Sequence, residues 1–183
     1  AIGSADIQSK DMTATAGFAN LYTDQNRLLL QDRPVASRKQ SRISGRTIQM
    51  FTEGDFLRRI EVHDSARGEF NEPDETDTLK VDRSILTGKD IVFAFDSGQL
   101  RTVTCAGQAY SWYLPSDRGK AETNEHTVSG DTIVFEVLEE KLQTVLVDGG
   151  AIGTFVSISQ QTQDTVIVVK RDTIDYRGES ITY

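Results

Sequence analysis

The chain has 183 residues, a net charge of −8, and 26% charged and 37% hydrophobic residues. This composition is ordinary for one globular domain and excludes a disordered chain or a disulfide scaffold, so we take residues 1–183 as a single domain. The acidic charge argues against a nucleic-acid partner, because such binding depends on Lys and Arg neutralising phosphates.

Two further features of the sequence concern membrane segments and the redox compartment. No apolar run approaches the roughly 20 residues that a membrane-spanning helix needs, and the first residues lack the charged-then-apolar pattern of a signal peptide. The sequence therefore predicts a soluble protein or the soluble part of one. The single cysteine, Cys105, has no partner for an internal disulfide and leaves the redox compartment open.

Internal repeats are the main signal of the sequence. A degenerate copy is expected near residues 14–40, where the spacing of the apolar residues differs from that of the later copies. Regular copies follow near residues 43–70, 86–113 and 128–155, and a partial copy lies at 174–183. The regular and partial copies share a Gly-x-x-Ile unit, which recurs about every 43 residues at Gly45–Ile48, Gly88–Ile91, Gly130–Ile133 and Gly178–Ile181.

Apolar residues recur at even offsets from each of these isoleucines. The columns at +2, +12, +14, +18 and +22 hold, in turn, Met50, Phe93 and Phe135; Ile60, Val103 and Val145; Val62, Cys105 and Val147; Ala66, Ala109 and Ala151; and Phe70, Tyr113 and Phe155. Even offsets share one face of a strand, so each copy is predicted to be a half-buried β-hairpin. Gly54 and Gly98 fit the tight turns, whereas the third copy lacks a turn glycine over 138–141.

No segment has the periodicity of an amphipathic helix, and we predict an all-β fold. One hairpin cannot bury its apolar face alone, so the copies are expected to stack into a solenoid-like or jelly-roll body with one continuous interior. Small residues recur at +18 and also at +20, where they are Gly68, Ser111 and Gly153. They either let two sheets close tightly or leave room for a ligand. The last copy stops at Tyr183, which predicts an unpaired strand edge and either head-to-tail assembly or a truncated longer protein.

These repeats resemble the LptA/OstA-like family, most clearly over residues 44–62, 88–109 and 130–151 and in the opening stretch 14–36. The resemblance implies an open β-jelly roll of stacked antiparallel hairpins and a periplasmic, non-enzymatic protein that carries lipopolysaccharide acyl chains towards the outer membrane. It also implies lipopolysaccharide or lipid A as a partner, together with edge-to-edge pairing with other OstA-like domains, including copies of itself. Burial alone suffices for acyl chains, because each methylene group removed from water contributes about 0.8 kcal/mol.

Site residues follow from the resemblance position by position. The candidates for an apolar groove are Ile48, Met50, Ile91, Phe93, Phe95, Ile133, Phe135, Val145, Val147 and Phe155. Arg58, Arg59 and Arg101 are the candidates for contact with an anionic headgroup, although a solvated charged face explains them more simply. No cofactor and no metal are expected.

Other interpretations stay open. The chain is alternatively a structural β-repeat segment of a larger envelope protein that assembles by its strand edges and binds no lipid; a packed, dry interior favours this view. Tyr110 and Trp112 also fit a carbohydrate-binding surface if both rings are exposed on one flat face. His63 and Cys105 invite an enzyme, but the columns place His63 outward beside a turn and Cys105 in the core. The acidic stretch 72–77 lacks the spacing of a calcium loop.

Overall fold

The computed structural model describes residues 2–8, 12–73, 81–116, 122–139, 141–163 and 166–182. The acidic residues 74, 75 and 77 lie outside these ranges. The described residues form no α-helix, so the all-β prediction is confirmed, and no helix among them is long and apolar enough to cross a bilayer. The strands are β1 (Ile2–Gln8), β2 (Thr13–Tyr22), β3 (Arg27–Gln31), β4 (Val35–Arg38), β5 (Ser41–Ser44), β6 (Thr47–Glu53), β7 (Phe56–Pro73), β8 (Val81–Asp96), β9 (Gln99–Leu114), β10 (Glu122–Leu138), β11 (Lys141–Gln163) and β12 (Val166–Thr182), with a 3-10 turn at Thr23–Gln25.

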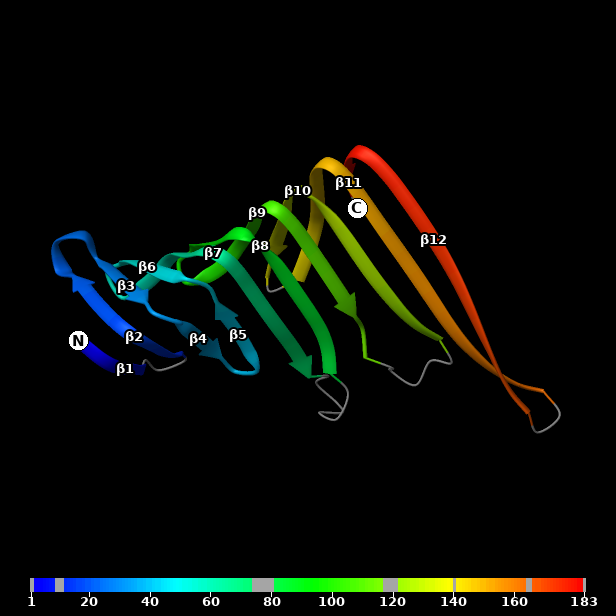
Figure 1. The fold of residues 1–183 in the computed structure, drawn as a ribbon, viewed down its shortest axis with the longest axis horizontal. Coiled ribbons are helices and arrows are strands. Elements are labelled where there is room, and N and C mark those ends of the chain that lie inside the picture. The colour runs from blue at the N-terminus through cyan, green and yellow to red at the C-terminus, as the bar shows by residue number, and fades with distance from the viewer. Residues whose placement is uncertain are drawn as a thin grey trace.

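All of these strands pair antiparallel within one sheet, and from β6 onward each pairs with the next in the chain. β3 with β4, and β5 with β6, are two halves of one interrupted strand, because β2 pairs with both β3 and β4 while β7 pairs with both β5 and β6. The strands are therefore stacked along the long axis from β1 at one end to β12 at the other (Figure 1).

A sharp corner divides each returning strand at the same place in every repeat. Two successive residues have positive φ there: Asp64 and Ser65 at 58° and 59°, and Gly149 and Gly150 at 78° and 67°. Gly107 and Gln108 occupy the corner of the second repeat, with φ of 76° and 56°. The pairing register shifts at each of these corners, which is the signature of an irregularity that bends the strand.

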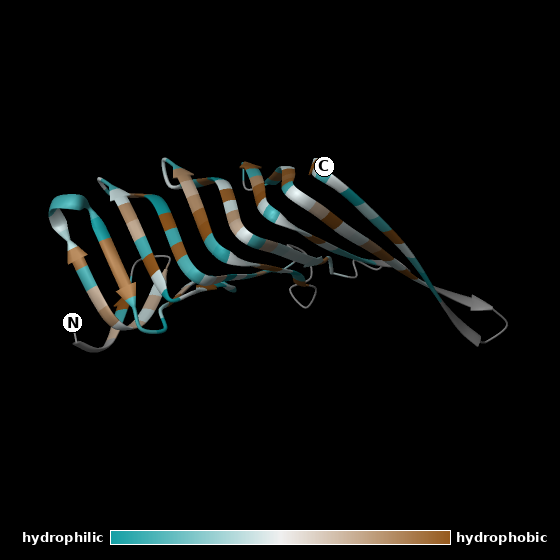
Figure 2. Cartoon of the chain, turned by 45° about the horizontal axis from the view of Figure 1, so that its top comes forward, coloured by the Kyte–Doolittle hydropathy of each residue, from teal (hydrophilic) through white to brown (hydrophobic). Residues whose placement is uncertain are grey.

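The corners fold the sheet over into two arms, and the bends follow one another along its length (Figure 2). We call residues 27–31, 47–63, 90–106, 132–139 and 141–148 the turn-side arm, because it carries the hairpin turns. Residues 66–73, 81–88, 109–116, 122–130, 151–159 and 170–178 form the far arm. In the third repeat Glu139 adopts a φ of 51°, so this turn forms without the glycine that the other copies use.

Close contacts with the neighbouring strand explain why the Gly-x-x-Ile unit begins with glycine. Gly88 lies beside the corner of the neighbouring strand, where an added Cβ would be 2.6 Å from Cys105 Sγ and 3.0 Å from the Ala106 carbonyl oxygen. At Gly130 the same atom would be 2.8 Å from Val147 Cγ1 and 2.9 Å from the Asp148 carbonyl oxygen. Only a residue without a side chain permits this close approach of the two backbones.

The degenerate first copy has the same corner. Asp32 and Arg33 have φ of 61° and 55°, and Gly17 donates its N–H to the Asp32 carbonyl oxygen at 2.9 Å. The buried residue that follows is Pro34 in place of the alanine of later copies. A different spacing on the outgoing strand hides this equivalence in the sequence, since Gly17 is not followed by an isoleucine three residues later.

Candidate functional site

A deep row of side chains runs along the inner face of the turn-side arm, next to the corners. Strand pairing brings these residues side by side in the order Leu30, Ile48, Val62, Ile91, Cys105, Ile133 and Val147. Each of them has a relative exposure of 0%. The far arm presents Ala66, Ala109 and Ala151 to the same core, each 1% exposed. Large side chains therefore pack against small ones, and the +18 alanines serve to close the arms tightly.

Exposure of the inner face increases away from the corners. The second row contains Met50, Phe93 and Val145, which are 3%, 4% and 3% exposed, and Phe135, which is half-buried. Nearer the turns, Phe95 is half-buried, and Leu142 in the third repeat is 57% exposed.

All ten groove candidates lie on the inner face of the two arms, but they differ in access. Ile48, Ile91, Ile133 and Val147 have no exposed surface, so in this conformation they form the core. Phe95, Phe135 and Phe155 are half-buried and retain some exposed surface.

A row of mostly aromatic side chains crosses the inner face of the far arm. Strand pairing places Phe70, Ser84, Tyr113, His126, Phe155 and Ile174 side by side. The His126 ring packs edge-on against Phe155 with centroids 4.6 Å apart, and lies 6.2 Å from Tyr113. Burial lowers the pKa of His126 below its usual value of 6.5, so its uncharged form is favoured among these rings. The alternation from Val128 would have indicated that His126 points inward.

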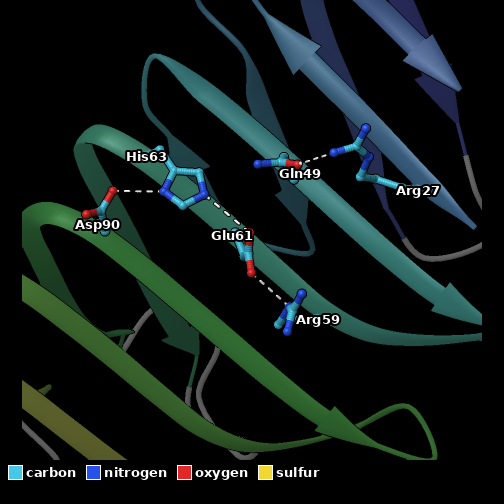
Figure 3. A network of polar contacts seen from close by, with 6 residues as sticks. All are labelled: Arg27, Gln49, Arg59, Glu61, His63 and Asp90. Carbon is cyan, nitrogen blue, oxygen red and sulfur yellow. Dashed lines mark hydrogen bonds and ion pairs between the residues drawn. The ribbon is translucent and has the colours of Figure 1, made fainter. Parts of the chain in front are cut away.

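The outer face of the turn-side arm carries a polar network that the sequence did not reveal. His63 Nδ1 lies 2.8 Å from Asp90 Oδ1, and His63 Nε2 lies 3.3 Å from Glu61 Oε2. Figure 3 shows the imidazole between the two carboxylates, with Glu61 continuing to Arg59 Nε at 2.9 Å. The outward position predicted for His63 agrees with this arrangement. Glu61 is on the same face of the same strand, whereas the Asp90 partner depends on the register between β7 and β8.

The three headgroup candidates separate into two groups. Arg58 Nη1 and Arg101 Nη2 lie 3.7 Å and 3.6 Å from the two carboxylate oxygens of Asp96, so the stacked hairpins bring these two arginines to the same carboxylate. Arg58 Nε also pairs with Glu53 at 2.9 Å. Arg59 instead joins the His63 network, and its guanidinium lies 4.4 Å from the centroid of the Phe51 ring.

Tyr110 and Trp112 alternate with inward-facing residues of β9 and lie on the outer face of the far arm. Tyr110 is 38% exposed, whereas Trp112 is half-buried and its Nε1 donates a hydrogen bond to Glu125 Oε1 at 2.6 Å. One of the two rings therefore lacks the full exposure that a carbohydrate platform needs. Over the described ranges no group of three or more His, Cys, Asp or Glu side chains is arranged to hold a metal ion.

Comparison with known proteins bears on the fold. No protein-family model and no curated protein sequence matches the chain. Among solved structures it is similar to LptH, described as the LptA homologous periplasmic component of the conserved lipopolysaccharide transport device from Pseudomonas aeruginosa. The match has a TM-score of 0.55 at 15% sequence identity and covers 89% of this chain and 93% of that chain. The chain has an LptA-like fold.

This likeness confirms the predicted open jelly roll of stacked antiparallel strands. The solved neighbour is a transport component. At 15% identity the two proteins share the fold alone.

Proposed function

We propose that the chain is a non-enzymatic, periplasmic lipid-binding module that carries acyl chains of lipopolysaccharide or lipid A between its two arms, towards the outer membrane. The observation that carries this proposal is the continuity of the apolar inner face from β3 to β11. No polar or charged residue among the described side chains is fully buried in it, and Ser84 and His126 are half-buried on the far arm. A surface of this kind contributes binding energy through burial of methylene groups and needs no polar recognition.

Within this interior we assign the acyl chains to the outer rows. The deep row holds the arms together and exposes no surface, whereas Phe135 and Phe155 remain accessible on opposite arms. Chains lying between these two rings would contact Met50, Phe93 and Val145 only after small movements of the arms. Ile48, Ile91, Ile133 and Val147 then act as the floor of the groove.

Two further parts of the proposal concern partners. Arg58 and Arg101 converge on Asp96 near the hairpin turns, where a phosphate of the headgroup would take the place of the carboxylate. The strands at the two ends of the stack, β1 and β12, offer backbone N–H and C=O groups to another OstA-like domain or a second copy.

Photo-crosslinking tests the central claim. A benzophenone amino acid is placed at Phe135, at Phe155 or at outward-facing Thr104, and each folded protein is mixed with lipid A. We expect adducts at Phe135 and Phe155 and none at Thr104. Equal labelling at all three positions would indicate adsorption of lipid aggregates, and that result or an absence of adducts would contradict the proposed function.

A second candidate is a structural β-repeat segment that assembles through its edges without lipid. The complete burial of the deep row favours it, because a dry and closely packed interior needs no guest. This candidate predicts no crosslink to lipid A at Phe135 or Phe155, while the protein remains folded and self-associates.

A further inference from the structure

The small residues at +20 behave differently from the alanines at +18. Gly68 lies on the inner face of the far arm, two residues beyond Ala66 and two before Phe70. The atoms nearest an added Cβ at Gly68 belong to the Phe70 ring, whose Cε2 and Cζ would each be 2.7 Å away. The ring is thus folded back over the glycine, in the space that a side chain at residue 68 would otherwise take.

The same ring reaches the opposite arm. Its centroid lies 6.1 Å from that of Phe93, and the ring planes are inclined by 60°. Phe70 pairs with Ser84 on its own arm, whereas Phe93 pairs with Ile60 and Val103 on the turn-side arm. The contact between the two rings therefore crosses the interior and closes it at β7 and β8.

The third repeat has a related arrangement. An added Cβ at Gly153 would meet the ring of Tyr176, which belongs to the neighbouring strand β12. In the second repeat the corresponding residue is Ser111, and the Tyr113 hydroxyl donates a hydrogen bond to Asp82 Oδ2 at 3.0 Å. Both glycines at +20 are therefore covered by an aromatic ring from another position.

We infer that Gly68 forms a notch for a lipid acyl chain and that the Phe70 ring occupies this notch until the chain displaces it. This inference rests on the proposed function and adds a residue that regulates access to the site. Phe70 is suited to the role because its ring is half-buried, and rotation of the ring towards the opening between the arms would vacate the notch. Phe93, which is 4% exposed, is fixed in the core and becomes one wall of the vacated space.

The inference has an energetic consequence. A ring that has to leave before the chain enters lowers the apparent affinity, because part of the binding energy is used to displace it. Each methylene group that gains a buried place is worth about 0.8 kcal/mol, which corresponds to a factor of about four in affinity. Removing the ring is therefore expected to strengthen acyl binding, in contrast to the usual effect of truncating a groove residue.

The test compares lipid A affinity among four variants of the full chain. Phe70→Ala empties the notch and should bind at least about fourfold more tightly than the wild type, with Phe70→Leu intermediate. Adding Gly68→Val to Phe70→Ala refills the notch and should reverse the gain. This double variant is expected to fold, because the three atoms nearest the added Cβ all belong to the Phe70 ring, which Phe70→Ala removes. Phe155→Ala, in the same column but beside His126, should weaken binding.

The possible results separate this inference from the proposed function. If the wild type binds lipid A while Phe70→Ala and Phe70→Leu bind no more tightly, the notch is wrong and the proposed function stands. A gain in Phe70→Ala that Gly68→Val does not reverse also overturns the inference, since the chain then lies elsewhere. Absence of binding by the wild type and every variant would overturn both.

Discussion

His63 on β7 lies directly opposite Asp90 on β8, and its Nδ1 is 2.8 Å from the Asp90 carboxylate. The other ring nitrogen faces Glu61. Carboxylates only accept hydrogen bonds, so the doubly protonated imidazolium is the form that satisfies both contacts. Burial lowers the pKa of His63, but the hydrogen bonds and charges of Asp90 and Glu61 outweigh it and raise the pKa above 6.5.

The pH dependence of stability should reveal this contact. Because the pKa of His63 is raised on folding, its stabilising contribution is complete below pH 6.5 and is lost as the pH rises through the folded-state pKa. We expect His63→Gln to be less stable than the wild type at pH 5.5, by about 0.5 kcal/mol for such a partly exposed pair, and nearly equal to it at pH 9. Urea denaturation at both pH values measures the difference.

Asp90→Asn provides the matched control, since it removes the strongest partner and keeps the side-chain shape. Titration of the His63 ring by NMR should then show a lower pKa than in the wild type. A stability gap between the wild type and His63→Gln that is constant over this pH range would contradict the assignment.

His126 should respond to pH in the opposite direction. Burial lowers its pKa on folding, so its uncharged form favours the native state at pH above 6.5 and stability falls as the pH drops through the folded-state pKa. We expect His126→Phe to remove this acid-induced loss, because a phenyl ring fits between Tyr113 and Phe155 without titrating. The chain has only two histidines, which makes separate NMR titrations straightforward. A His126 pKa above 6.5 would show this interpretation to be wrong.

Cys105 should behave as a buried aliphatic residue. It has 0% exposure, burial raises the pKa of its thiol to about 11, and Sγ donates to the Thr87 carbonyl oxygen at 3.2 Å. We expect no reaction with a thiol reagent in the native state and full reaction in denaturant. Cys105→Val should cost less than about 1.5 kcal/mol, because the equivalent positions in neighbouring repeats hold valine. Fast labelling of the folded protein would contradict this placement.

The repeat glycines should be far less tolerant than the turn glycines. Gly88→Ala forces a methyl group against Cys105 and the backbone of the next strand, and we expect a loss of about 1–3 kcal/mol in the free energy of unfolding. Gly54→Asn is the control, since Gly54 has a φ of 57°, which Asn tolerates, and open space around it. Its effect should stay within about 0.5 kcal/mol. Equal losses in the two variants would exclude the steric account of the Gly-x-x-Ile unit.

The sequence predicted the inner face well because alternation along a strand is local. The columns of Ile48, Val62 and Ala66 all point into the core, and the period alone places them there. The corner at Asp64 and Ser65 could not be predicted, because neither residue type requires positive φ and only the third repeat has two glycines at this point. The pairing of His63 with Asp90 depends on the register between strands, which a single sequence does not specify.

Side-chain size alone did not predict the role of the small residues at +18 and +20. The alanines at +18 and the glycines at +20 are both small, yet Ala66 is enclosed between the arms while Gly68 lies beneath a ring. Whether a small residue closes a core or leaves space depends on where its neighbours' side chains turn. Rotamers such as that of Phe70 are set by packing across the interior rather than by the local pattern.

The arginines near the hairpin turns offer the last test. Arg58 and Arg101 both form ion pairs with the Asp96 carboxylate. An anionic headgroup therefore has to compete with Asp96 for these two arginines. Asp96→Asn removes the competitor and keeps the side-chain shape, so it should strengthen lipid A binding, whereas Arg101→Ala should weaken it. Both changes should shrink as salt rises, because the sites are exposed. Arg59→Ala is the control, since Arg59 is paired with Glu61 and covers Phe51, and it should leave affinity unchanged. Equal, salt-independent effects of Arg59→Ala and Arg101→Ala would mean that none of these arginines contacts the headgroup.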